Sequence, residues 1–208
     1  MEKILVAGAH GTTGKKIVSI LKSSTEFEPV AMVRKEDQVQ FFKDQGIQTV
    51  FADLEKDVSE ATKGIDRVIF AAGSGGKNVE GVDQEGAKKL VDASKKSGVK
   101  KFVMLSSMGA DKPETATKLK DYLKAKHNAD EHLKKSGINY SIIRPGALTN
   151  NDGNGKIELA PTLNKSGEIP RQDVAETLVN ALGDSVAKNK TFEILKGEHS
   201  IKDALQKM

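Results

Sequence analysis

Residues 6–14 read VAGAHGTTG and place three glycines, Gly8, Gly11 and Gly14, three positions apart. The run follows a short apolar stretch and precedes a segment whose apolar residues recur at helical spacing. A strand, a glycine-rich turn and a helix in this order predict a phosphate site: Gly8 permits the tight turn, Gly11 admits a pyrophosphate, and Gly14 lets the helix pack closely on the sheet. The phosphates are expected at the helix N-terminus, where unpaired N–H groups favour negative charge.

Short apolar runs alternate with segments of helical periodicity along the whole chain, which is typical of βαβ units and a parallel sheet. We predict strands at 3–7, 29–33, 49–51, 66–71, 101–105, 140–143 and 191–195, and helices at 14–22, 38–45, 85–97, 119–135 and 171–182. Arg144 to Gly146 is expected to end the sixth strand, and 147–167, rich in Asn, Gly and Asp, predicts a substrate-side loop or hairpin with a short strand at 156–159. The pattern indicates an α/β fold, a doubly wound parallel sheet (Rossmann) with helices on both faces, as a single domain over residues 1–208.

The composition excludes several classes of function. The 208 residues are 37% hydrophobic and 30% charged, typical of a globular protein, and the absence of cysteine removes disulfides, thiolate nucleophiles and cysteine metal sites. The 33 basic residues are scattered among 29 acidic ones, so no nucleic-acid partner is expected, and the four histidines lack metal-ligand spacing. No apolar run is long enough for a membrane span, and the N-terminus lacks a signal-peptide pattern, so we expect a cytoplasmic protein. A monomer and a homodimer both fit the sequence, which does not decide between them.

The residues after the second predicted strand decide which dinucleotide fits. Proteins of this fold that prefer NAD place Asp or Glu there to bind the ribose hydroxyls, whereas this chain has Arg34 and Lys35. Two cations can hold a ribose 2′-phosphate, so the sequence favours NADPH over NADH. The alternative is that Arg34 only faces solvent.

Further residues are expected around the same ligand. Thr12 and Thr13 can add hydroxyl donors at the helix N-terminus, and His10 is interpreted as a hydrogen-bonding residue of the turn. Residues after the third strand are expected near the adenine ring, and small residues after the fourth leave room for the central part of the cofactor. These residues are Asp53, Leu54, Ala71, Ala72 and Gly73.

Five more motifs follow in order: VDQEG at 82–86, FVMLSS at 102–107, YLKAK at 122–126, IRPG at 143–146 and RQDVA at 171–175. With the glycine turn they make nearly the whole chain resemble the short-chain dehydrogenase/reductase superfamily, in particular atypical members similar to truncated NAD(P)-dependent epimerase/dehydratases. The resemblance implies a dinucleotide cofactor and places Lys126 and Pro145 among the residues that bind it.

In that superfamily a serine, a tyrosine and a lysine carry the chemistry, and the matching residues here are Ser107, Tyr122 and Lys126. Residues four apart share a helix face, so the Lys126 ammonium can stabilise the ionised phenol of Tyr122 and also hold the nicotinamide ribose. The Ser107 hydroxyl can bind a substrate carbonyl. The chain departs from the family in having Asp83 where many members have asparagine, and in lacking the large C-terminal substrate domain of full epimerases, which predicts a shallow substrate pocket.

These observations lead us to expect an NADPH-dependent oxidoreductase that transfers hydride to a small carbonyl or conjugated acceptor, with Tyr122 as the proton donor. Two alternatives stay open. One is an enzyme resembling the flavin or biliverdin reductases, in which an open pocket accepts a flat ring and the tyrosine matters little. The other is a non-catalytic NADPH-sensing protein that changes partner when the cofactor binds.

Overall fold

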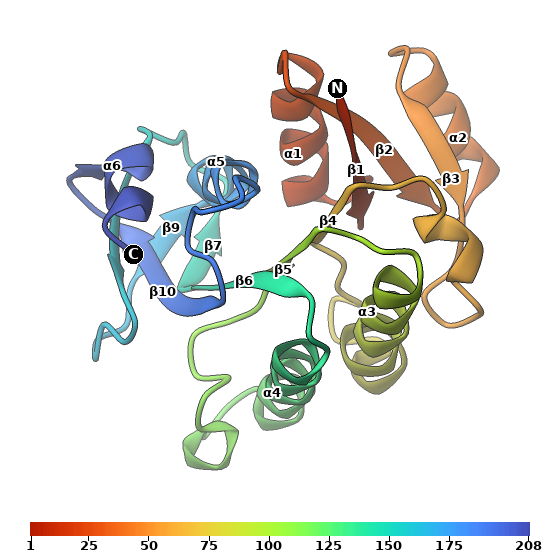
Figure 1. The fold of residues 1–208 in the computed structure, drawn as a ribbon. Coiled ribbons are helices and arrows are strands. Elements are labelled where there is room, and N and C mark those ends of the chain that lie inside the picture. The colour runs from red at the N-terminus through yellow and green to blue at the C-terminus, as the bar shows by residue number, and fades with distance from the viewer.

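One nine-stranded sheet runs through the computed structural model, which describes all residues from Met1 to Met208 (Figure 1). The strand order is β11-β8-β10-β6-β5-β4-β1-β2-β3. The first six strands and β10 are parallel, whereas β8 is antiparallel to β10 and β11 is antiparallel to β8. The bounds are β1 Glu2–Ala7, β2 Phe27–Val33, β3 Gln48–Phe51, β4 Arg67–Phe70, β5 Lys101–Leu105, β6 Asn139–Pro145, β8 Lys156–Ala160, β10 Lys190–Lys196 and β11 His199–Ser200.

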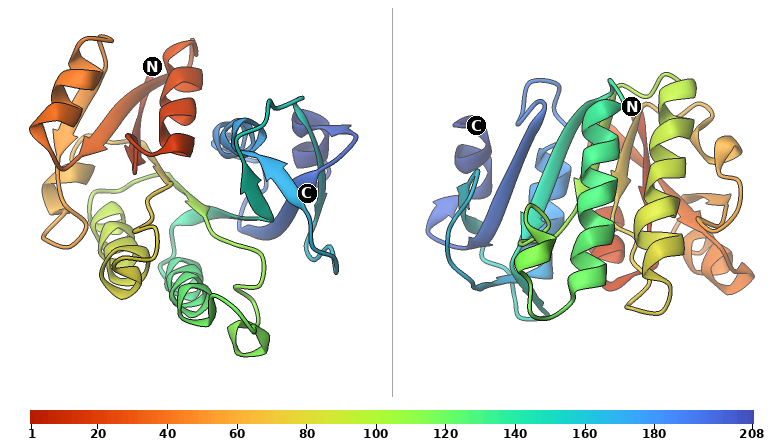
Figure 2. Two further views of the ribbon diagram at one scale, coloured as in Figure 1. Left: turned by 180° about the vertical axis from the view of Figure 1, so that it is seen from behind. Right: turned by 90° about the horizontal axis from the view of Figure 1, so that it is seen from below.

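Helices cover both faces of this sheet (Figures 1 and 2). On one face lie α1 Thr12–Lys22, α2 Glu36–Lys43, α5 Arg171–Asn180 and α6 Ile201–Gln206, and on the other lie α3 Ala87–Lys96 and α4 Lys120–Lys135. Alternate residues of β1 face opposite ways, so Ile4 and Val6 join the first core and Leu5 and Ala7 the second. The sheet therefore has the predicted doubly wound arrangement, with β1 and β4 meeting where the strand order reverses.

The short strand predicted at 156–159 is present as β8, but residues 147–167 form more than the predicted substrate-side loop or hairpin. The sixth strand continues through Arg144 to Pro145, β7 (Ala147–Thr149) pairs in parallel with β9 (Glu168–Pro170), and β8 joins the main sheet. Two buried carboxylates far along the chain hold this segment: Asp173 accepts a hydrogen bond from Gly155 N at 2.9 Å, and Glu193 accepts one from Leu163 N at 2.7 Å. Such distant partners cannot be recognised in a local pattern of Asn and Gly.

Several further elements were not anticipated. The predicted helix over 85–97 is preceded by a π-helix, η2 (Val79–Gly86), which passes directly into α3. After the last predicted strand, the chain adds β11 and α6. Short 3₁₀ turns, η1 (Ser59–Thr62) and η3 (Pro113–Thr115), lie in the connections after β3 and β5.

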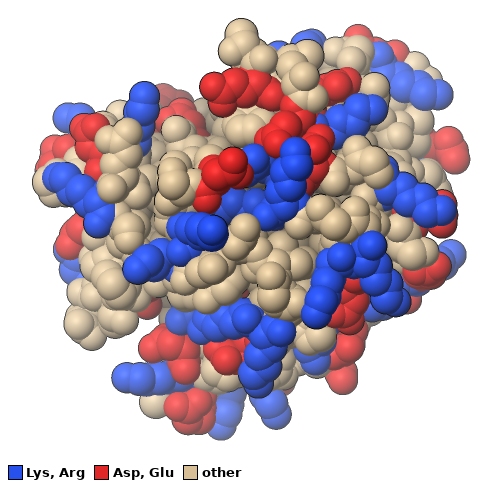
Figure 3. All heavy atoms as spheres, in the orientation of Figure 1, with Lys and Arg blue, Asp and Glu red and all other residues tan.

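The surface mixes charges of both signs. In the view of Figure 3, lysine and arginine are interspersed with aspartate and glutamate over most of the face. None of the helices combines the length and the apolar character that crossing a membrane requires.

Candidate functional site

The glycine turn after β1 has two kinds of glycine. Gly8 has a φ of +83°, and a Cβ there would lie 2.6 Å from the backbone of Ala72 at the end of β4. A Cβ on Gly14 would overlap the Gly8 carbonyl oxygen, so this glycine lets α1 pack against the turn. A Cβ on Gly11 would meet only the Gly8 oxygen, at 3.2 Å. Gly8 and Gly14 are thus required by packing, whereas Gly11 leaves open space above the turn.

The N-terminus of α1 is free to bind an anion. The helix begins at Thr12, with Gly11 as a cap that makes no side-chain hydrogen bond, and its first turn has no acidic residue. Its first backbone N–H groups therefore lack an intrahelical or capping partner. Thr12 is exposed at this end, whereas Thr13 is buried.

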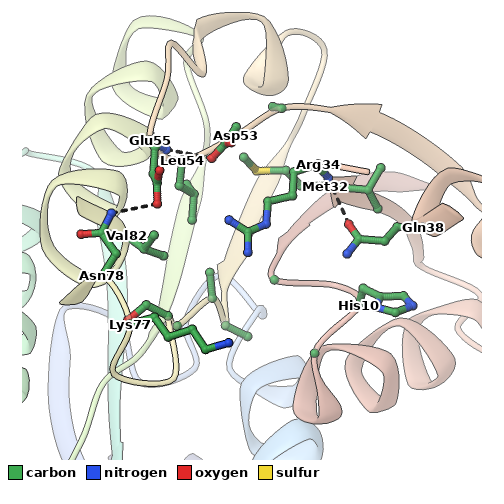
Figure 4. A pocket seen from close by; sticks show the side chains of 18 residues that line it. His10, Met32, Arg34, Gln38, Asp53, Leu54, Glu55, Lys77, Asn78 and Val82 are labelled. Carbon is green, nitrogen blue, oxygen red and sulfur yellow. Dashed lines mark hydrogen bonds between the residues drawn. The ribbon is translucent and has the colours of Figure 1, made fainter. Parts of the chain in front are cut away.

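A cavity of about 390 Å³ opens beside this turn, at the carboxyl ends of β1, β2 and β4 (Figure 4). In open α/β sheets, ligands bind at the carboxyl ends of the strands where the strand order reverses, and the cavity lies at this point. Nine of the predicted cofactor residues line it: Gly8, His10, Gly11, Arg34, Asp53, Leu54, Ala71, Ala72 and Gly73.

The remaining predicted residues lie outside the cavity wall. They are Thr12, Thr13, Gly14, Lys35, Ser107, Tyr122, Lys126 and Pro145. Conversely, Gln38, Ser74, Lys77 and Asn78 line the cavity and were not predicted. The sequence did contain a signal for three of these, because GSGGKN at 73–78 places polar and glycine residues directly after a buried strand.

Arg34 occupies the end of β2. Its side chain is exposed and points into the cavity, while its backbone N–H donates to Gln38 Oε1 at 3.1 Å (Figure 4). Its guanidinium group makes no ion pair within the protein. Lys35, also exposed, is the cap residue of α2 and lies outside the wall. The structure therefore brings only one of the two predicted cations to the cavity.

His10 lies at the edge of the cavity against two aromatic rings. Its ring meets Phe41 and Phe42 edge-on, with centroid separations of 5.1 and 6.2 Å. Burial, aided by the nearby Lys15 ammonium, holds the pKa of His10 below its usual range. A neutral imidazole is consistent with the role of a turn residue.

Tyr122 and Lys126 lie together on the first turns of α4. The Lys126 Nζ atom is 5.6 Å from the centroid of the Tyr122 ring and donates to the Leu105 carbonyl oxygen at 3.4 Å. Ser107, just after β5, donates its hydroxyl to the Met108 carbonyl oxygen at 3.2 Å. No hydrogen bond connects the Tyr122 hydroxyl to either of its expected partners. The structure thus pairs the tyrosine with the lysine, but the serine hydroxyl is bonded locally.

Asp83 connects this pair to the cavity. The carboxylate is 1% exposed, and its Oδ2 atom accepts hydrogen bonds from Ser74 N at 3.0 Å and Ser74 Oγ at 2.7 Å. Its Oδ1 atom has no hydrogen bond and lies 3.5 Å from Lys126 Nζ, whose side chain is also buried. Asp83 is therefore the counter-ion of Lys126 and the anchor of a residue in the cavity wall.

Another buried carboxylate, that of Asp130, lies on α4 one turn after Lys126. Asp130 Oδ2 accepts from Ser106 Oγ at 2.8 Å and from Arg144 Nε and Nη2 at 3.0 and 2.9 Å. Burial raises the pKa of Asp130, and the Arg144 guanidinium opposes this effect. The network joins α4 to the ends of β5 and β6, so it holds the helix that carries Tyr122 on the sheet.

Comparisons with known proteins agree with this geometry. Residues 8–185 match the model of the NAD(P)H-binding family. An uncharacterised sugar epimerase of Bacillus subtilis is 38% identical over 99% of this chain and 100% of its own length, and sanguinarine reductase of Eschscholzia californica is 31% identical over 92% and 88%. A solved structure from Bacillus halodurans, described as a candidate NAD-dependent epimerase/dehydratase, is 36% identical, covers 100% of both chains and superposes with a TM-score of 0.95.

Proposed function

The chain belongs to the NAD(P)H-binding family, among the atypical short-chain dehydrogenase/reductases, and we propose that it is an NADPH-dependent reductase of a small carbonyl or conjugated acceptor. The choice of NADPH rests on the Arg34 guanidinium, which lies inside the cavity at the end of β2. The name of the relative that reduces sanguinarine supports the choice of reduction.

The groups in and beside the cavity fit a dinucleotide. The open space above Gly11 and the uncapped start of α1 suit a pyrophosphate. Met32, Leu54 and Val82 supply an apolar wall for a flat base, and each is more than nine-tenths buried. Apolar surface for a ring thus occurs inside the cavity, and backbone donors for phosphates occur beside it.

Arg34 suits a 2′-phosphate better than a pair of ribose hydroxyls. A guanidinium binds phosphate oxygens through two charge-assisted hydrogen bonds, whereas it cannot accept a hydrogen bond from a hydroxyl. The position directly after β2, which binds the hydroxyls in NAD-preferring proteins when it is acidic, is this arginine. We therefore assign NADPH as the cofactor.

When bound, NADPH supplies the hydride that an acceptor needs for reduction. The chain's own residues would handle the proton and the orientation of the acceptor. The Tyr122 hydroxyl would donate the proton, while the Lys126 ammonium, fixed by the Leu105 carbonyl and by Asp83, would stabilise the phenolate left behind. Ser107 would bind the acceptor oxygen after releasing the Met108 carbonyl.

One observation favours a second candidate. The cavity does not reach Ser107 or Tyr122, and both residues are only half-buried. An open surface suits a flat-ring acceptor, as in flavin or biliverdin reductases, and such a reaction would not depend on the phenol. A protein that only senses NADPH would use the same cavity without any turnover.

Binding of NADPH and NADH to an Arg34→Asp variant tests the assignment. We expect NADPH affinity to fall at least about tenfold, because one charge-assisted contact is lost and repulsion is added, while NADH affinity changes little. Lys35→Asp, a neighbouring change outside the cavity wall, should have a smaller effect. Equal weakening of both dinucleotides by Arg34→Asp would contradict the assignment. A separate assay follows the oxidation of NADPH by a panel of carbonyls, conjugated acceptors and flavins. Turnover would indicate one of the two reductases, and binding without turnover would indicate the NADPH-sensing protein.

A further inference from the structure

Lys77 lies on residues 73–78, which connect β4 to η2 and form one wall of the cavity. In Figure 4 its ammonium reaches into the cavity from this wall, while the Arg34 guanidinium enters from the end of β2. The two cations come from segments far apart in the sequence and share one cavity. No prediction from the sequence included Lys77.

The charged side chains of the cavity wall form no ion pairs with one another. The wall also contains Asp53 and Glu55, but both carboxylates are engaged: Asp53 Oδ1 accepts from Glu55 N at 3.0 Å, and Glu55 Oε1 accepts from Asn78 Nδ2 at 2.8 Å. Neither Arg34 nor Lys77 makes an ion pair or a side-chain hydrogen bond within the protein. No carboxylate of the wall is paired with Arg34 or Lys77, so both cations are available to bind an anion.

The segment that carries Lys77 is held at both ends. At one end, Ser74 donates two hydrogen bonds to the buried Asp83 carboxylate. At the other, Asn78 donates to Glu55 and accepts from Gly81 N at 3.0 Å. These anchors keep the backbone of Lys77 at the cavity, so its position does not depend on the lysine itself.

We propose that Lys77 binds a phosphate group of the dinucleotide from the wall opposite Arg34. The inference rests on the proposed function, and it adds a binding residue from the segment after β4. The phosphate is either the pyrophosphate, which NADH also has, or the 2′-phosphate, which only NADPH has. In both cases the ligand is held between two cations and joins the 73–78 segment to β2.

Dissociation constants of Lys77→Gln for NADPH and NADH, measured by the fluorescence of the reduced nicotinamide at low salt, test this proposal. Glutamine keeps much of the length of the side chain and removes the charge. We expect NADPH affinity to fall about tenfold. A parallel loss for NADH identifies the pyrophosphate, and an unchanged NADH affinity identifies the 2′-phosphate. Lys43→Gln, an exposed lysine in the last turn of α2 outside the cavity, is the matched control.

Proteolysis at saturating NADPH gives a second readout. Trypsin can cut after Lys77, which is exposed, and we expect NADPH to slow this cut in the wild type more than a cut at Lys43. If Lys77→Gln binds both dinucleotides as the wild type does, while Arg34→Gln loses NADPH affinity, the cofactor assignment stands and the role of Lys77 is wrong. If the wild type binds neither dinucleotide, both proposals are wrong.

Discussion

The cavity wall and the buried ion pairs beside it, Lys126 with Asp83 and Arg144 with Asp130, hold their charged groups in two different environments. Around the cavity, Arg34 and Lys77 are exposed and have no protein partner. Beside it, Lys126 is buried against Asp83, and Arg144 is buried against Asp130. The cost of burying a charge explains why the buried cations are paired and the exposed ones are not. An ion removed from water needs a fixed partner, whereas an exposed cation is stabilised by water until a ligand binds. The first region is therefore suited to binding and the second to holding a reactive group in place.

The largest effect expected in the cavity region is that of Gly11→Val. The side chain would fill the space above the turn, so we expect no measurable NADPH binding by calorimetry, while the melting temperature stays near that of the wild type. Gly14→Ala is the contrasting variant, because its Cβ would overlap the Gly8 carbonyl oxygen and destabilise the fold. Wild-type affinity in Gly11→Val would show that the turn does not hold phosphate.

In the second region, Tyr122→Phe should act on turnover alone. The change removes only the phenolic oxygen, and general acid catalysis contributes roughly 10²–10⁴-fold, so kcat with the best acceptor should fall by about that factor. Cofactor affinity should hardly change. Lys126→Met should differ by also weakening cofactor binding. A kcat for Tyr122→Phe within about twofold of the wild type would favour the flavin-type reductase, whereas NADPH binding without turnover in the wild type would favour the sensor.

Asp83→Ala tests whether the buried ion pair of Asp83 with Lys126 stabilises the fold. The change leaves the Lys126 ammonium buried without a counter-ion and removes the acceptor of Ser74, so we expect a loss of about 3–5 kcal/mol in the free energy of unfolding. Urea denaturation measures it. Glu60→Ala, which breaks the exposed pair with Lys63, should leave stability close to that of the wild type. Similar results for the two variants would contradict the contrast between the regions.

The smallest predicted effect concerns Lys101, a buried cation at the opposite ends of the strands. Its ammonium donates to the Gly183 and Val186 carbonyl oxygens, and burial lowers the pKa of Lys101 from 10.5 to about 8. Between these values the unfolded chain holds the proton and the folded chain does not, so this residue makes stability rise with pH from about 8 to 10.5. The rise is at most about 3 kcal/mol.

Lys101→Met, which cannot titrate, isolates this contribution. The difference in unfolding free energy between the wild type and the variant should shift in favour of the wild type as the pH rises through the same window. A difference that does not vary with pH would show that Lys101 keeps its usual pKa.

Much of the fold could be predicted because its signals are local. The strand at 101–105 has the predicted bounds, and most others differ by one or two residues at their ends. The errors concern segments whose structure depends on distant partners. The strand at 156–159 was predicted within a polar loop or hairpin, but its pairing with β10 in the main sheet was not. A π-helix also precedes α3, where its buried Asp83 meets Ser74 and Lys126.

By itself, the sequence determined the glycine turn, the order of strands and helices, and the arginine at the end of β2, because backbone freedom and apolar periodicity act over a few neighbouring residues. Only the tertiary structure decided that Arg34 and Lys77 share a cavity while Lys35 stays outside it, and that Asp83 neutralises Lys126. These outcomes depend on which strand ends meet and how deeply each charge is buried. The meeting of strand ends and the depth of burial cannot be predicted from spacing along the chain, because a residue 40 or more positions away supplies the compensating charge.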